Sequence, residues 1–163
     1  MSRPPIASAP EPLPHLHLIA PPPVLYLGTL LLGLLLQALW PTPFFIDIAL
    51  RLWGCGLLLV GAGLARWSFL TLKRAGTSGN PRTDSTALVK SGPFAFSRNP
   101  IYLAMTLLYL GLGLLLDAAW VLTLLPVLLG LMNWGVIQRE ETYLEARFGS
   151  GYRDYQRQVR RWF

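Results

Sequence analysis

The chain has 163 residues, of which 53% are hydrophobic and only 13% charged, and its mean hydropathy is +0.44. Soluble domains carry about 25% charged residues, and disordered chains combine low hydrophobicity with high net charge, so both classes are excluded. The net charge of +6 is spread beside apolar stretches rather than over a soluble face, which predicts a small polytopic membrane protein with no nucleic-acid partner.

The first 23 residues predict a flexible, proline-rich tail. Eight of the 14 prolines lie between Met1 and Pro23, and each proline removes a backbone donor and clashes with the preceding helical turn. His15 and His17 lie in this tail without neighbours that would complete a metal site, so no metal is expected. Cys55 is the single cysteine, which excludes an intramolecular disulfide and a cysteine-based metal site.

Four apolar spans follow and predict an all-α fold, in which residues 24–163 form one domain with four transmembrane helices. The expected spans are residues 24–40, 46–72, 101–116 and 119–137. A helix of about 20 apolar residues crosses a hydrocarbon core about 30 Å thick. The segment Leu114–Trp120, with Asp117 near its middle, is the expected tight turn of a helical hairpin. Pro126 and Asn133 indicate either packing features or a local kink in the last span.

Paired glycines in these spans predict close packing of helices through small residues. They are Gly54/Gly56, Gly61/Gly63 and Gly111/Gly113. No pair lies between an expected strand and a helix, so a dinucleotide-binding fingerprint is not indicated.

The loops predict an orientation in the membrane. The Lys73–Arg98 loop carries five basic residues against one acidic residue, and the segment from Arg139 carries six arginines against four acidic residues. The turns around Thr42 and Asp117 contain no lysine or arginine. The positive-inside rule then places both termini and the basic loop in the cytoplasm.

Two polar segments, residues 88–102 and 138–152, flank the expected hairpin. A hairpin brings the beginning of its first arm close to the end of its second arm. We therefore expect Arg98–Tyr102 and Glu140–Glu141 to be near neighbours, although about 40 residues separate them in the sequence.

The first polar segment has the chemistry of an anion site. Asn99 is a favourable N-cap and Pro100 fits the first helical position, so a helix is expected to begin here. Its free amides, together with Arg98, favour a carboxylate or a phosphate. Tyr102 adds an aromatic face and a hydroxyl from the first turn. A helix cap with a topology-setting arginine is an equally weighted explanation.

The second polar segment has the opposite charge. Glu140 and Glu141 follow directly after an apolar span, at headgroup depth, where unpaired carboxylates are costly. They either pair with Arg98 or Arg139, or hold a ligand's ammonium group or ribose hydroxyls.

The segment 138–163 ends in a second pattern. Gly149 is a natural helix stop, and apolar residues then recur at helical spacing against arginines, which predicts an interfacial amphipathic helix. The apolar residues are Tyr152, Tyr155, Val159 and Phe163, and the arginines are Arg153, Arg157, Arg160 and Arg161. We expect these arginines to anchor the chain to lipid headgroups without a catalytic role.

An anion site, a cation site and aromatic faces together suit a zwitterion with a ring system. S-adenosylmethionine (SAM) fits that description, although these residues alone do not select it over other ligands. The run Leu-Val-x-Ser-Gly-Pro-Phe-x-x-x-Arg-Asn-Pro-x-Tyr, followed by Glu-Glu-x-x-Leu-x-x-x-Phe-Gly-x-x-Tyr-x-x-Tyr, resembles the integral-membrane isoprenylcysteine carboxyl methyltransferase and phospholipid methyltransferase superfamily. The resemblance covers roughly residues 86–163, about half of the chain.

This resemblance implies a bacterial inner-membrane enzyme that transfers a methyl group from SAM to a lipophilic or membrane-associated acceptor at the cytoplasmic face. It implies a catalytic set of Arg98, Asn99, Tyr102 and Glu140. The cofactor would be held by Thr86, Ala87, Leu88, Val89, Gly92, Phe94, Arg98, Asn99, Pro100, Tyr102, Glu140 and Glu141. Within this set Arg98 would bind the methionine carboxylate, Glu140 or Glu141 the ammonium or ribose, and Phe94 and Tyr102 the adenine or sulfonium.

Three positions depart from the family pattern. Asn99 stands where the family usually has histidine, and an amide cannot act as a base near neutral pH. Phe94 replaces a frequent tyrosine. Val136 stands where prenylcysteine enzymes carry an arginine, which argues against a prenylcysteine carboxyl substrate. An amine, a thiol, a carboxylate and a small lipophile all stay open as acceptors, and no oligomeric state is indicated.

Two other functions remain alternatives. Membrane reductases of the steroid and sterol type use NADPH and carry a similar run of residues, but this chain has Ile101 where they have asparagine, and it lacks an obvious additional phosphate cluster. A non-catalytic membrane scaffold is the third hypothesis.

Overall fold

The computed structural model describes residues 19–42, 47–77 and 87–162, and all the regular elements in them are helical. The elements are α1 (Pro22–Leu39), α2 (Ile48–Arg74), the 3-10 turn η1 (Gly92–Ala95), α3 (Pro100–Leu115), α4 (Ala119–Met132), the π-helical turn η2 (Asn133–Ile137), α5 (Gln138–Phe148) and α6 (Ser150–Gln158). This confirms the all-α prediction for the described residues. Most of the expected tail, residues 1–18, lies outside them.

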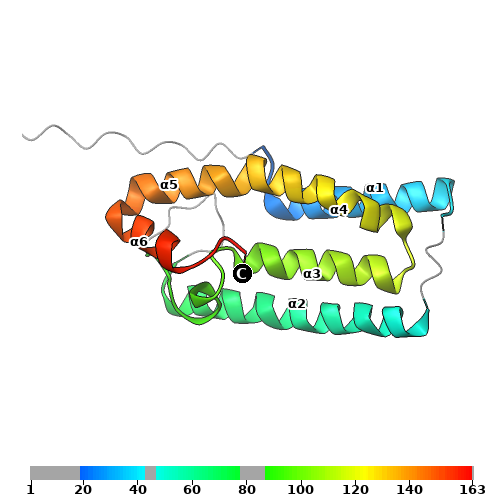
Figure 1. Cartoon of the computed structure of the whole chain (residues 1–163), viewed down its shortest axis with the longest axis horizontal. Coiled ribbons are helices and arrows are strands. Elements are labelled where there is room, and N and C mark those ends of the chain that lie inside the picture. The colour runs from blue at the N-terminus through cyan, green and yellow to red at the C-terminus, as the bar shows by residue number, and fades with distance from the viewer. Residues whose placement is uncertain (1–18, 43–46, 78–86, 163) are drawn as a thin grey trace, which may run out of the picture.

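The four long helices run side by side along the long axis of the molecule (Figure 1). Helix α2 packs along α3, and α1 packs along α4. Helix α5 continues the line of α4 beyond the bundle, and α6 turns back across that end. The core lies between α1, α3 and α4 and includes the buried residues Tyr26, Tyr109, Val121, Leu128, Met132 and Val136.

Among the residues that the structure describes, three helical stretches are long and apolar enough to cross a membrane: Pro22–Leu39, Ile48–Arg74 and Ala119–Phe148. The fourth apolar helix, α3, is shorter, with 16 residues. Helix α1 begins before residue 23, the expected end of the tail, because Pro22 occupies its first turn, where the missing amide hydrogen is not needed. The amide of Ile19, also in the expected tail, donates to the carbonyl of Gly135 (3.4 Å), so these tail residues already contact the bundle.

The predicted hairpin turn between α3 and α4 is confirmed. Asp117 adopts a left-handed backbone (φ 51°), and the Ala118 amide donates to the Gly113 carbonyl at 3.0 Å, which closes the end of α3. The Asp117 carboxylate lies 3.5 Å from the Arg51 guanidinium on α2.

Substitutions of Asp117 should report this backbone conformation. Asp117→Val is expected to lose about 1–2 kcal/mol of unfolding free energy, because a β-branched residue is strained in the left-handed region. Asp117→Gly also removes the carboxylate, yet it should lose less, since glycine has no Cβ penalty there. Unfolding in detergent, followed by circular dichroism, measures both; a greater loss for glycine would mean that the ion pair, not the backbone, dominates.

Half of the six glycines predicted to pack closely lie at the α2–α3 contact. A Cβ at Gly54 would approach the Gly111 carbonyl to 2.9 Å, and a Cβ at Gly111 would approach the Gly54 carbonyl to 2.8 Å. By contrast, nothing described lies within 4 Å of a Cβ built at Gly56 or Gly63. The packing prediction is therefore wrong for these two glycines within the described chain.

Helix α4 passes into α5 through a π-helical turn rather than a sharp break. Pro126 lies inside α4, and Asn133 begins η2. A π turn bonds residue i to i+5 instead of i+4, so the residues after it are rotated around the axis relative to a continuous α-helix. This rotation sets the direction in which the side chains of α5 point.

Candidate functional site

A cavity lies where α3 begins and α5 leaves α4. Of the twelve residues predicted to hold the cofactor, ten line it: Ala87, Leu88, Val89, Phe94, Arg98, Asn99, Pro100, Tyr102, Glu140 and Glu141. Thr86 lies outside the described residues. The structure therefore brings the two polar segments to one place, as the hairpin argument predicted.

Gly92 does not line the cavity. It begins η1 with a positive φ of 61°, and a Cβ there would meet the Thr71 hydroxyl of α2 at 2.9 Å. Glycine at this position lets η1 pack closely against the end of α2. Its contact with a cofactor stays a prediction.

Arg98 and Glu141 form an ion pair beside the cavity, with Nη1 3.1 Å from Oε1. Both side chains are only 12% exposed. Neither Nε nor Nη1 of Arg98 has a well-aligned hydrogen bond to a described residue, although both atoms are buried. Buried guanidinium donors whose hydrogen bonds are not well made are costly, so this arrangement favours an anionic ligand.

Glu140 has different surroundings from its neighbour. Its Oε2 accepts a hydrogen bond of 2.8 Å from the hydroxyl of Tyr102. Within the described chain, no lysine or arginine forms an ion pair with Glu140. The Glu140 carboxylate therefore lines the cavity without a cationic partner from these residues, which favours a cationic ligand.

The residues after α6 do not form the predicted amphipathic helix. Helix α6 ends at Gln158, and Val159 is extended; Phe163 lies outside the described residues. The following residues return to the start of α3 (Figure 1), where the Arg98 amide donates to the Arg160 carbonyl at 3.0 Å. A continuous helix from Tyr152 onward was the wrong expectation because tertiary contacts with α3 override the spacing pattern.

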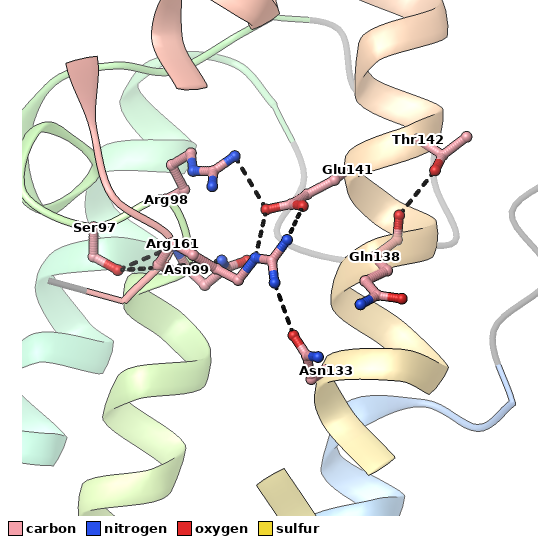
Figure 2. Close-up of polar contacts among 8 residues, drawn as sticks. All are labelled: Ser97, Arg98, Asn99, Asn133, Gln138, Glu141, Thr142 and Arg161. Carbon is pink, nitrogen blue, oxygen red and sulfur yellow. Dashed lines mark hydrogen bonds and ion pairs between the residues drawn. The ribbon is translucent and has the colours of Figure 1, made fainter. Parts of the chain in front are cut away.

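The Arg161 side chain is 34% exposed and is held in this network by hydrogen bonds (Figure 2). Its Nε and Nη2 donate to the two carboxylate oxygens of Glu141, at 3.0 and 2.7 Å, and its Nη1 donates to Asn133 Oδ1 at 3.0 Å. The hydrogen bonds to Glu141 raise the pKa of Arg161 above its ordinary value. The expected anchoring role is therefore wrong for this arginine.

Asn99 occupies the N-cap position of α3, as predicted, but its side chain does not cap the helix. Its Nδ2 donates instead to the Arg161 carbonyl at 2.9 Å, and the Ser97 hydroxyl donates to the same oxygen at 3.3 Å. Figure 2 shows both side chains directed at the returning segment. The amide thus fastens the C-terminal segment to the beginning of α3.

Helix α6 closes another side of the cavity with aromatic residues. Tyr152 and Tyr155 are 2% and 3% exposed and line the cavity, and the Tyr155 hydroxyl donates to the Phe94 carbonyl at 2.6 Å. Burial and the nearby Glu141 carboxylate raise the pKa of Tyr152 to about 12, so its hydroxyl stays protonated near neutral pH. The predicted apolar face therefore packs on the protein.

Sequence reasoning missed part of this lining. The additional residues are Leu72, Thr77, Ile101, Leu144, Tyr152 and Tyr155. The two tyrosines were visible as part of the second motif, whereas no spacing signal pointed to Arg161 or to its acceptor Asn133.

Comparisons with known proteins agree with this picture. A family model described as phospholipid methyltransferase matches residues 50–151, which is more than half of the chain and includes both polar segments up to α6. An uncharacterized protein of Haemophilus influenzae (strain ATCC 51907 / DSM 11121 / KW20 / Rd) is 42% identical over 64 residues, which are 38% of this chain and 98% of that protein. No solved structure matches the chain significantly. By this match, the chain belongs to the phospholipid methyltransferase family.

Proposed function

We propose that the protein is an integral-membrane methyltransferase that binds SAM in this cavity and methylates a lipophilic or membrane-associated acceptor. One observation carries the proposal: Arg98, whose buried Nε and Nη1 make no well-aligned hydrogen bond to a described residue, and Glu140, which has no ion-pair partner among the described residues, line the same cavity. A zwitterionic amino acid moiety would satisfy both groups at once. The family assignment supports methyl transfer as the reaction.

The two glutamates have separate roles in this proposal. Glu141 already accepts two hydrogen bonds from Arg161 and lies within ion-pair distance of Arg98. We therefore assign the ligand's ammonium or ribose hydroxyls to Glu140. Arg98 would hold the carboxylate, helped by the partial positive charge at the start of α3.

The chemistry needs little acid or base catalysis. When bound, SAM supplies a methyl group already activated by a sulfonium. The residues of the chain then have to orient the reactants and exclude water, which can account for much of a barrier reduction. Phe94 and Tyr102 offer aromatic faces to the sulfonium or the adenine. Asn99 does not replace a histidine base in this scheme, because its amide does not titrate and holds the Arg161 carbonyl.

An apolar part of the lining suits a lipophilic acceptor. Leu72, Ile101 and Leu144 contribute to it from three helices. We propose that α3 crosses the membrane as the fourth span, and that both termini face the cytoplasm of a bacterial inner membrane, as the positive-inside rule predicts. The acceptor would then approach from the bilayer and the cofactor from the cytoplasm.

Isothermal titration calorimetry of the purified protein in detergent tests the proposal. We expect SAM and its demethylated product to bind and NADPH not to bind. Binding of NADPH alone would instead support the reductase, which the family assignment does not favour. Binding of none of the three would favour a scaffold. Transfer of labelled methyl groups from SAM to a panel of amines, thiols, carboxylates and membrane lipids then identifies the acceptor class.

A further inference from the structure

The residues after α6, Val159–Trp162, form a strap that joins the two sides of the cavity. On one side its backbone carbonyls accept hydrogen bonds from the Arg98 amide, the Ser97 hydroxyl and the Asn99 amide group. On the other side the Arg161 side chain reaches η2 and α5 (Figure 2). The strap therefore links the beginning of α3 to the glutamate-bearing helix.

The Arg161 guanidinium donates one hydrogen bond to each carboxylate oxygen of Glu141, in a bidentate arrangement. The two distances are 3.0 and 2.7 Å, and a third donor is fixed by Asn133 at 3.0 Å. Such paired hydrogen bonds between arginine and a carboxylate are the strong, directional kind. They fix the orientation of the Glu141 carboxylate.

This orientation determines what Arg98 can do. Arg98 approaches Glu141 at 3.1 Å through Nη1, without a well-aligned hydrogen bond. If the Glu141 oxygens were not already held by Arg161, the carboxylate could rotate and form a bidentate pair of hydrogen bonds with two Arg98 donors. Those donors would then be lost to the cavity.

We propose that Arg161 is a positioning residue that keeps Glu141 from capturing Arg98, and so leaves the Arg98 donors available to a ligand carboxylate. This inference rests on the proposed binding of SAM. It assigns no contact with the ligand to Arg161, which acts through Glu141. It also explains why two adjacent glutamates at one cavity differ in their partners.

The test is a double-mutant cycle on SAM affinity, measured by calorimetry in detergent. Arg161→Ala is expected to weaken binding about 10-fold, because a misplaced binding group loses an aligned hydrogen bond to a charged ligand. Adding Glu141→Gln to Arg161→Ala should recover at least about threefold of that affinity, since a neutral amide holds Arg98 less strongly. A double variant that binds as weakly as Arg161→Ala, or more weakly, would overturn the proposal.

Control variants separate this effect from general damage. Arg157→Ala removes an arginine with an 80% exposed side chain and should leave the affinity unchanged; a loss equal to that of Arg161→Ala would contradict the inference. Arg161→Lys keeps the charge but not the fork, so its affinity should lie between wild type and Arg161→Ala. If Arg161→Ala does not fold, the cycle is performed with the lysine variant, and Glu141→Gln is expected to recover part of its smaller loss of affinity; no recovery would overturn the proposal.

A readout without cofactor distinguishes failure of this inference from failure of the proposed function. In arginine-labelled protein, NMR should show slower hydrogen exchange at Arg98 Nε–H in Arg161→Ala than in wild type, because Glu141 then accepts that hydrogen bond. Slower exchange in a protein that binds no SAM would keep the positioning role and reject the methyltransferase. Normal SAM binding by the wild type, with hydrogen exchange and SAM affinity unchanged in Arg161→Ala, would reject the positioning role and keep the proposed methyltransferase.

Discussion

Replacing Glu140 with glutamine is expected to weaken SAM binding about 30- to 150-fold. Glutamine keeps the size of the side chain and can still accept the Tyr102 hydroxyl hydrogen, so only the charge is removed. A hydrogen bond to a charged group contributes about 2–3 kcal/mol when its partner has no replacement, which corresponds to this range. Calorimetry in detergent measures the effect. Glu140→Ala should abolish detectable binding, because it also leaves the buried Tyr102 hydroxyl without its acceptor.

The choice of ligand sharpens this experiment. The demethylated product keeps the ammonium and ribose of SAM but lacks the sulfonium charge. If Glu140 binds the ammonium or ribose, the affinities for SAM and for its demethylated product should fall by the same factor in Glu140→Gln. A loss of affinity for SAM alone would instead place the sulfonium beside Glu140.

Glu145→Gln is the matched control for Glu140→Gln. It is the same change in the same helix, but Glu145 is 44% exposed and pairs with Arg153 at 3.5 Å, and it does not line the cavity. We expect its SAM affinity, like that of Arg157→Ala, to equal that of wild type. Comparable losses in Glu145→Gln and Glu140→Gln would remove the special role of Glu140.

Gly111→Val is expected to destabilise the helix bundle by about 2–3 kcal/mol, within the range of overpacking a close contact. A Cβ at this position would lie 2.8 Å from the Gly54 carbonyl oxygen and 2.9 Å from Leu58. Backbone atoms of α2 cannot move aside as a flexible side chain can, so the two helices would have to separate. Thermal unfolding in detergent should show a clear decrease in Tm.

Gly63→Val provides the comparison for this steric effect. Gly63 lies in α2 with nothing described within 4 Å of an added Cβ. Valine there should change the stability by less than about 1 kcal/mol, since it brings only a small difference in helix propensity. Equal decreases in Tm for Gly63→Val and Gly111→Val would show that the α2–α3 contact is not the cause.

The sequence was sufficient to predict the elements that depend on local patterns. Uninterrupted apolar runs located the helices, and proline at the beginning of α3 and Gly149 after α5 marked their ends. The proximity of Tyr102 to Glu140 followed from topology alone, because a hairpin has to return its second arm to the level of the first. The 2.8 Å hydrogen bond between them confirms that argument.

The features that the sequence did not predict depend on tertiary contacts. An amphipathic spacing shows that Tyr152 and Tyr155 share a face, but a bilayer and a protein cavity satisfy that face equally well. The return of Arg161 to Glu141 requires α6 to end at Gln158, and no breaking residue marks that end. The preference of Asn99 for a distant carbonyl over its own helix could likewise not be inferred from capping propensities.

The uninterrupted stretch Ala119–Phe148 has 30 residues, so at about 1.5 Å per residue this rod is about 45 Å long. A hydrocarbon slab is about 30 Å thick, and roughly three turns therefore overhang it. Helix α3, with 16 residues, spans only about 24 Å and begins near the base of that overhang. In the proposed reaction, the nucleoside of SAM would bind against the overhanging turns while the lipophilic acceptor stayed in its leaflet, so neither reactant would have to cross the membrane surface to meet the other.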